Sequence, residues 1–236
     1  QPIYNTYDDS LSGAEALIRW NSRKYGFIGP NTFIPLLEDS ALIIPLGRWI
    51  INTAAKACNR WITSIPNFVM HINLSFVQIV KSNIVKDVLE NIERYSAANN
   101  HYVFEITETI EMDQIPAVQN VFKEFVKNEF RFAIDDFGTG YSNYGYMRDR
   151  TFDIVKVDRS FVTDIDKLKD NYLMVSFIIK MAHEMGLHVC IEGVETNEEL
   201  SCVKKLGADY IQGYYYGKPV CLQDFEEQHL KRFVLG

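Results

Sequence analysis

DIVKVDRSFVTDIDKLKDNYLMVSFIIKMAHEMGLHVCIE, residues 153–192, contains a strand pattern, a helix pattern and a second strand pattern in succession. The β-rich runs Asp153–Val157 and His188–Ile191 are typical of buried strands. Between them, one helix face is marked by Val175, Ile178, Ile179 and Ala182. This order predicts two strands joined by a helical crossover.

The same alternation recurs along the rest of the chain. The other predicted strands are Ile3–Asn5, Gly13–Trp20, Phe68–Leu74, Tyr102–Thr107, Arg131–Asp135 and Tyr210–Ile211. Further helix faces are marked by Ile84, Val85, Val88, Leu89 and Ile92, and by Ile115, Val118, Phe122, Phe125 and Val126. Thr196 and Glu199 form a capping-box pattern, and Gly207 is placed to close that helix. About eight such units predict an α/β fold of the TIM-like (β/α)8 barrel type, although a doubly wound open sheet would give a similar order.

Length and composition favour one globular domain over residues 1–236. The chain is 47% hydrophobic, which allows a sizeable core, and no linker-like tract divides it. The four cysteines are far apart and the five histidines show no zinc-site spacing, which favours a reduced, cytoplasmic setting. No membrane-spanning run is present. The apolar start Gln1–Tyr4 suggests a domain excised from a longer signalling protein, which would leave room for an upstream sensor or an inner-membrane anchor in the parent.

The charge balance argues against a long nucleic acid partner. There are 24 basic and 31 acidic residues, a net charge of −7. A duplex or long single strand needs an overall positive field, so such a partner is not expected. A small anionic ligand would require a local cation, either a metal ion or a well-placed Arg.

Nearly every predicted strand ends in an ionisable or amide side chain. These residues are Glu15, Asn73, Glu105, Asp135, Asp136, Lys156, Asp158, Glu192, Glu195 and Gln212. In a barrel the strand ends converge on one rim, where barrel enzymes place their chemistry. A single acidic residue at a strand end is more often a helix cap or a solvated turn, but so many together favour a shared site.

The carboxylates of this rim point to divalent metal ions. Several like charges in one cavity must either raise their pKa values sharply or bind cations. Oxygen ligands with one amide, from Asn73, favour Mg²⁺ or Mn²⁺ over zinc or copper. Where the backbone turns, the adjacent Asp135 and Asp136 could serve two metals. The glycine-bearing segment Asp136–Gly140 follows directly and is either a cover over the site or an ordinary turn.

Two basic residues are candidates for the chemistry of the same rim. Lys156 shares a strand face with Asp158, so an inward ammonium could help to activate water, although a lone Lys in a strand is more often solvent-facing. Arg19 alternates with Leu17 along its strand and could bind a phosphate, with a surface salt bridge as the alternative.

Taken together, these motifs resemble the EAL-domain cyclic di-GMP phosphodiesterases over essentially the whole chain. The matching stretches are Gly13–Trp20, Asn73–Ser75, Glu105–Glu108, Asp135–Ser142, Lys156–Phe161, Glu192–Thr196 and Gln212–Tyr214. The order and spacing of these stretches are highly specific. Two segments depart from the family pattern, 141–147 and 214–219, where Gly217-Lys218 replaces the usual Ser-Arg.

The resemblance implies a role for each residue of the rim. One metal would be held by Glu15, Asn73, Glu105 and Asp135, and a second would lie among Asp135, Asp136 and Glu192. The catalytic residues would be Glu15, Lys156, Glu192, Glu195 and Gln212, with Lys156 and Gln212 next to the attacking water and Glu195 supporting Lys156. The dinucleotide would contact Gln1, Leu17, Arg19 and Asp158. Glu108 would anchor the loop 136–142, which in this family couples the site to a dimer interface.

The family mechanism is also implied by the resemblance. A metal-bound hydroxide would attack phosphorus in line, with two Mg²⁺ or Mn²⁺ ions neutralising the developing charge, and the product would be linear pGpG. Ca²⁺ would inhibit, and the protein would be a homodimer.

Two other functions remain compatible with the sequence. A receptor would bind cyclic di-GMP and signal without cleaving it, and a lost metal ligand would favour that role, but the sequence shows none. An enolase-like barrel that abstracts protons would also place carboxylates and Lys at strand ends, with one essential Mg²⁺ under a carboxylate substrate.

Overall fold

The structure is a computed structural model that describes residues 1–95, 97–107, 116–139 and 151–231. Eight strands close into a barrel in the order β1-β10-β9-β8-β7-β6-β5-β2. They are β1 (Pro2–Asn5), β2 (Leu11–Ala16), β5 (Val69–Asn73), β6 (Tyr102–Thr107), β7 (Arg131–Phe137), β8 (Ile154–Val157), β9 (His188–Glu192) and β10 (Tyr210–Gln212). The predicted TIM-like barrel is therefore confirmed.

Strand β1 departs from a regular β/α repeat. It pairs antiparallel with both β10 and β2, whereas the other neighbouring strands of the barrel pair in parallel. Antiparallel strands need only a short connection, and residues 6–10 join β1 to β2 without a helix.

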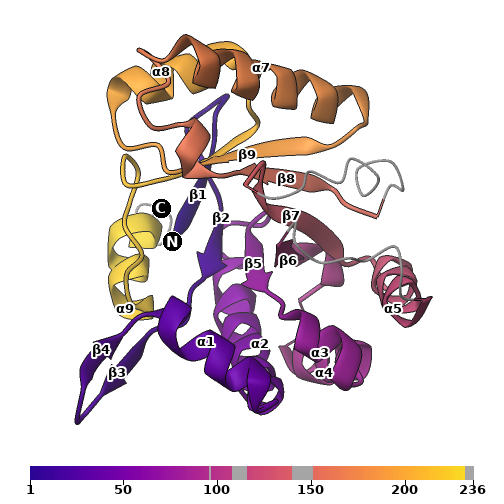
Figure 1. The fold of residues 1–236 in the computed structure, drawn as a ribbon. Helices are drawn as coiled ribbons and strands as arrows, with labels where there is room; N and C mark the ends of the chain where they lie inside the picture. The colour runs from indigo at the N-terminus through magenta and orange to yellow at the C-terminus, as the bar shows by residue number, and fades with distance from the viewer. Residues whose placement is uncertain (96, 108–115, 140–150, 232–236) are drawn as a thin grey trace.

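Helices cover the outside of the barrel. They are α1 (Pro30–Asp39), α2 (Ile43–Trp61), α3 (Phe76–Lys81), α4 (Ile84–Ile92), α5 (Pro116–Lys127), α7 (Lys169–Glu184), α8 (Asn197–Leu206) and α9 (Leu222–Phe225). In Figure 1, α7 and α8 lie beside β8 and β9, while α1 to α4 lie on the opposite side of the barrel. None of the helices in the described ranges is long and apolar enough to cross a bilayer.

The predicted helix faces match the buried sides of the helices, with one exception. The predicted face of α7 is buried, and so are Val118, Phe122 and Phe125 on α5. Val126 was placed on the buried face but is 47% exposed, because it lies one position past the buried row that ends at Phe125. Ile115 lies outside the described residues.

The predicted capping box of α8 is present in the structure. The Thr196 hydroxyl accepts from the Glu199 backbone N–H, and a Glu199 carboxylate oxygen accepts from the Thr196 N–H. Gly207 ends the helix with a φ of 84°, a left-handed conformation that suits glycine.

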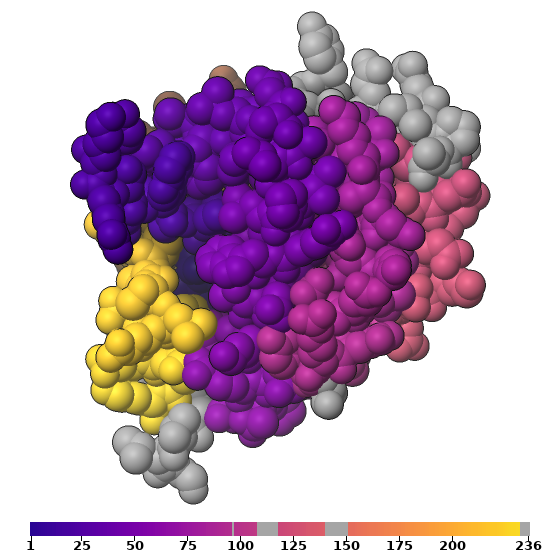
Figure 2. Space-filling model, turned by 90° about the horizontal axis from the view of Figure 1, so that it is seen from below, coloured from indigo at the N-terminus to yellow at the C-terminus, as the bar shows by residue number. Residues whose placement is uncertain are grey.

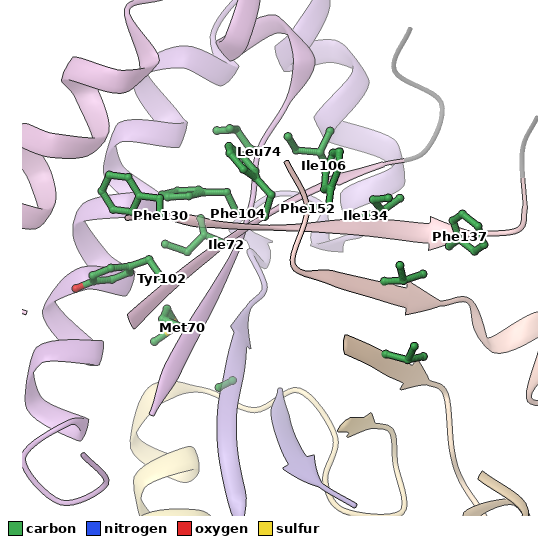
Figure 3. Packing of buried hydrophobic residues seen from close by; sticks show 14 of the residues in the cluster. Met70, Ile72, Leu74, Tyr102, Phe104, Ile106, Phe130, Ile134, Phe137 and Phe152 are labelled. Atoms are coloured by element: carbon green, nitrogen blue, oxygen red, sulfur yellow. The ribbon is translucent and has the colours of Figure 1, made fainter. Parts of the chain in front are cut away.

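Aromatic rings fill the space between the barrel and α5. Phe104 is fully buried and meets Phe125 edge to face, with the ring centroids 5.1 Å apart. Phe130 and Phe132 complete the cluster at 5.5 and 6.4 Å from Phe104. Figure 3 shows Phe104 and Phe130 with neighbouring aliphatic side chains beside the strands. This packing fixes β6 and β7, two strands whose ends carry acidic side chains.

A hairpin that the sequence analysis missed follows β2. The predicted strand Gly13–Trp20 is wrong beyond Ala16, where β2 ends. Trp20–Ser22 forms β3, which pairs antiparallel with β4 (Gly26–Ile28) and projects from the barrel (Figure 1). The Trp20 ring packs edge to face on Phe33 of α1 at 5.5 Å. Residues 17–19 therefore lie outside both strands, and they line the barrel mouth.

Candidate active site

Most of the polar side chains singled out in the sequence gather at the carboxyl end of the barrel. A cavity of about 850 Å³ opens there, large enough for a dinucleotide-sized ligand. Its lining includes Glu15, Leu17, Arg19, Asn73, Asp135 and Asp136. The predicted convergence of strand ends on one rim is thus what the structure shows.

Lys156 occupies the centre of this cluster. Its side chain is fully buried, and its Nζ lies 2.8 Å from Oε2 of Glu105 and 2.8 Å from Oε1 of Glu192. Asp135 Oδ1 lies at 3.1 Å and Glu15 Oε2 at 3.5 Å from the same nitrogen. Burial opposes the charge of Lys156, but the four carboxylates outweigh it and raise its pKa well above the usual value. The ammonium is therefore the fixed positive charge of the site.

Glu15 is held by two amides as well as by Lys156. Its Oε1 accepts from Asn73 Nδ2 and its Oε2 accepts from Gln212 Nε2, both at 2.5 Å. Burial opposes ionisation of Glu15, yet the Lys156 charge and these hydrogen bonds lower its pKa to about 2. Glu15 is thus an anion in a fixed orientation at the end of β2.

Glu105 has a partner that the sequence analysis did not assign to the site. Its Oε1 lies 2.7 Å from Nδ1 of His71, which is buried in the barrel. Burial and the nearby Lys156 charge lower the His71 pKa to about 3, so this imidazole is neutral. The signal in the sequence was the spacing of two between His71 and Asn73, which places both on the inward face of β5.

Asp135 and Asp136 reach the same cavity through a bulge in β7. The pairing of β7 with β8 shifts register between Ile134 and Phe137, and Asp136 has a φ of 53°. This irregularity lets two successive carboxylates approach one point, which an ideal strand would prevent. Ligand oxygens of Asp135, Asp136 and Glu192 lie within 4.8 Å of one another.

The electrostatics of these three residues suit a divalent cation. Burial raises the pKa of Glu192 to about 8 despite Lys156. Burial, followed by the Asp135 charge, also raises the pKa of Asp136. Asp135 Oδ1 is buried and, although close to Lys156, accepts no well-aligned hydrogen bond from the residues that the structure describes. Mg²⁺ and Mn²⁺ prefer oxygen ligands, and these carboxylates have too little positive charge nearby to balance them.

The residues proposed for the dinucleotide surround this centre. Gln1 Oε1 accepts from Gln212 Nε2 at 3.1 Å, and Gln1 Nε2 donates to the Gly217 carbonyl at 3.0 Å. Leu17 and Arg19 line the mouth. Asp158 accepts from the Ser160 backbone N–H at 2.9 Å, which is the turn-capping role that competed with a binding role.

Of the residues implied by the family resemblance, one lies apart from the cluster and another is not among the described residues. Glu195 is exposed, and in the described part of the chain the Lys156 ammonium pairs with Glu15, Glu105, Asp135 and Glu192 instead. Glu108 lies outside the described residues, as does the end of the loop 136–142 beyond Thr139.

A second cavity, of about 460 Å³, adjoins the mouth and has a largely apolar lining. It lies between the segment 14–21, helix α2 and the segment 219–225, and it shares Leu17 and Arg19 with the mouth. Figure 2 shows a recess between the indigo and yellow parts of the chain, where these segments meet.

Known proteins share this sequence and architecture. A model of the EAL domain family matches residues 1–219. The probable cyclic di-GMP phosphodiesterase PdeG of Escherichia coli is 32% identical over 225 residues, which cover 95% of this chain and 44% of that protein.

Two solved structures are similar throughout. The EAL enzyme Bd1971, in its form bound to cAMP and cyclic-di-GMP, has a TM-score of 0.91 and 35% identity, over 96% of this chain and 62% of that chain. The PaMucR phosphodiesterase in complex with c-di-GMP has a TM-score of 0.89 and 29% identity, over 95% of this chain and 92% of that chain. Against three longer curated relatives, this chain spans 35%, 26% and 30% of their length.

Proposed function

Because this chain belongs to the EAL domain family, we propose that it is a phosphodiesterase that hydrolyses cyclic di-GMP to linear pGpG. The observation that carries the proposal is the buried Lys156 ammonium surrounded by carboxylates from four different strands. Such a cluster at a barrel mouth is costly for stability alone, because each buried charge loses its hydration. PdeG and the PaMucR phosphodiesterase, both named for this chemistry, support the choice of substrate.

The proposed site would hold two divalent ions, Mg²⁺ or Mn²⁺. Glu15, Asn73, Glu105 and Asp135 would hold one, and Asp135, Asp136 and Glu192 would hold the other. Two observations fit this assignment: Asp135 Oδ1 has no hydrogen-bond partner among the described residues, and the Asn73 amide lies beside the Glu15 carboxylate. When bound, such ions make water more acidic and neutralise charge on phosphoryl oxygens.

The residues of the chain orient the reactants around this centre. Lys156 would donate a hydrogen bond to the attacking water, and Gln212 holds Glu15 in place for that step. Attack on phosphorus would form a P–O bond in line with the breaking bond to the 3′-oxygen, which leaves with a proton. Arg19, Leu17, Gln1 and Asp158 would contact the dinucleotide. Glu195 would support Lys156 once the substrate and its ions are bound.

A homodimer within a larger cytoplasmic protein is part of the proposal. Helix α7 exposes apolar side chains, including Leu173 at 54% and Phe177 at 57%, one turn apart. Glu108 would anchor the loop 136–142 and couple the site to the dimer. The greater length of the curated relatives supports a longer parent chain, for which we propose sensor or inner-membrane segments.

A hydrolysis assay tests the proposed activity. Purified protein is incubated with cyclic di-GMP and Mg²⁺ or Mn²⁺, and chromatography should then show pGpG. Turnover should stop with EDTA or Ca²⁺ and with Asp135→Asn, whereas Asp8→Asn, at an exposed residue of the segment 6–10 that leads into the amino end of β2, should match the wild type. Tight binding without pGpG would overturn the enzyme assignment in favour of a receptor. Turnover that survives EDTA would overturn the metal centre.

A further inference from the structure

His71 lies inside the barrel, one layer below the mouth. It alternates with Asn73 on β5, so both side chains point inward, and only 4% of its surface is exposed. The barrel floor just beneath is apolar and is formed by Ile3, Val103, Ala133, Ile154 and Cys190, with Val69 packed against them. An apolar residue at position 71 would continue this packing and would need no hydrogen-bond partner. The imidazole therefore calls for an explanation.

The partner of His71 is the carboxylate of Glu105. His71 Nδ1 and Glu105 Oε1 are 2.7 Å apart, and the two side chains are 5% and 0% exposed. The other oxygen of Glu105, Oε2, accepts from Lys156 Nζ at 2.8 Å. Each carboxylate oxygen of Glu105 thus has one nitrogen neighbour, and the two contacts together fix the rotation of the carboxylate about the Cγ–Cδ bond.

We propose that His71 is a positioning residue of the metal site, whose Nδ1–H donates to Glu105 and holds that carboxylate in the orientation in which it binds the cation. The assignment rests on the proposed function, because it requires Glu105 to be a ligand. A carboxylate that binds a cation is ionised and can only accept hydrogen bonds, so in the metal-bound state the proton of this bond belongs to Nδ1. Outer partners of this kind typically change metal affinity by about 10–100-fold when removed.

The hydrogen bond and the packing of His71 are separable by substitution. Leucine fills the space of the imidazole without a donor. Asparagine leaves a larger gap, but its Nδ2 is attached at the same point as the histidine Nδ1 and can donate to Glu105. If the hydrogen bond matters, His71→Asn should be the milder change. If the packing of the side chain matters instead, His71→Leu should be the milder change.

The experiment measures Mn²⁺ binding directly, without substrate, from the electron paramagnetic resonance signal of the free ion. Compared with the wild type, His71→Leu should raise the Kd for Mn²⁺ by about 10–100-fold. His71→Asn should restore most of the affinity. Circular dichroism in EDTA checks that each variant is folded, and His71→Val replaces His71→Leu if the latter is not.

Three results would overturn the assignment. These are an unchanged Kd in His71→Leu, an equal loss in His71→Asn, and loss of the fold in both apolar variants, which would make His71 purely structural. Failure of the proposed function would give a different result. A wild type that binds Mn²⁺ without producing pGpG would contradict the phosphodiesterase activity, and the Kd of His71→Leu relative to the wild type would still decide the role of His71.

Discussion

Replacing Lys156 with methionine removes the central charge of the site while keeping most of the side-chain volume. The ammonium is fully buried and has four carboxylates within 3.5 Å. At an effective dielectric constant of about 20, one ion pair at this range is worth about 4 kcal/mol before the cost of burial. Removing one partner of a buried pair typically costs about 3–5 kcal/mol, because the other charge is left uncompensated. We expect Lys156→Met to lose about that much stability in EDTA.

The size of the loss should depend on pH. Burial raises the pKa of Glu105 well above its usual value and that of Glu192 to about 8. Without the ammonium these two groups take up protons more readily, which relieves the repulsion as the pH falls. The destabilisation should therefore be larger at pH 8 than at pH 6. Urea unfolding in EDTA at both pH values measures the difference.

Divalent ions should reverse much of this loss. A cation that binds only the folded state stabilises it in proportion to the logarithm of its affinity, and the variant offers the cation an uncompensated set of carboxylates. Saturating Mn²⁺ should thus stabilise Lys156→Met more than it stabilises the wild type. The matched control is Lys86→Met, an exposed Lys with Nζ 3.6 Å from Glu90, which should change stability by less than about 0.5 kcal/mol.

The reasoning fails if Lys156→Met loses less than about 1 kcal/mol at pH 8 in EDTA, since a buried ion pair would then not be stabilising the apo site. It also fails if Mn²⁺ stabilises the variant no more than the wild type. In that case the four carboxylates would not be the metal-binding groups.

Three further predictions concern the scaffold, and urea unfolding tests each. Burial would raise the pKa of Asp209, but hydrogen bonds from His188, His183 and the Val189 backbone N–H outweigh it and lower the pKa to about 2. Asp209→Asn should therefore cost about 1–2 kcal/mol of stability near pH 5.5. That cost should shrink as the pH falls towards 2, where Asp209 begins to take up a proton in the folded state as well. It should also shrink as the pH rises through the raised pKa of His188, and a cost that is constant from pH 3 to 8 would contradict the linkage. A Cβ at Gly13 would lie 2.3 Å from the Val69 carbonyl oxygen, so Gly13→Ala should push β2 away from β5 and cost about 1–3 kcal/mol of stability. Unchanged stability would mean that the two strands can move apart without cost. Phe104→Ala should cost about 3–5 kcal/mol by leaving a cavity among aromatic rings, and a loss below about 1 kcal/mol would show that the cluster closes over the gap.

The barrel could be predicted because its strands are buried on both faces. Such strands have continuous apolar runs, and Tyr102–Thr107 was predicted with the bounds that β6 has in the structure. The end of β2 could not be predicted in this way, because Leu17, Ile18 and Trp20 continue the apolar pattern. What ends the strand is the loss of a pairing partner: Ala16 is the last residue paired with β5.

The acidic rim was also predictable, since side chains at strand ends of a closed barrel must converge. The contact of His71 with Glu105 was not, because a histidine inside an apolar run is usually read as part of the core. Nor does the sequence alone place Lys156 against four carboxylates at once. That contact depends on the register of β8 against β9 and β7. Lys156 pairs with Cys190 of β9, and the bulge of β7 lies on the other side of β8.

The position of Lys156 explains how one set of residues could serve both the folded apo protein and the proposed metal site. A single ammonium cannot balance the carboxylates around it, and the raised pKa values of Glu105 and Glu192 mean that these two groups hold a proton more readily than a solvated carboxylate does. A divalent cation can displace protons from these carboxylates, whereas the charge of a second buried Lys would stay in the site and repel the cation. The lysine thus supplies enough charge for the barrel mouth to form, and the remaining deficit is what gives the proposed ions their binding energy.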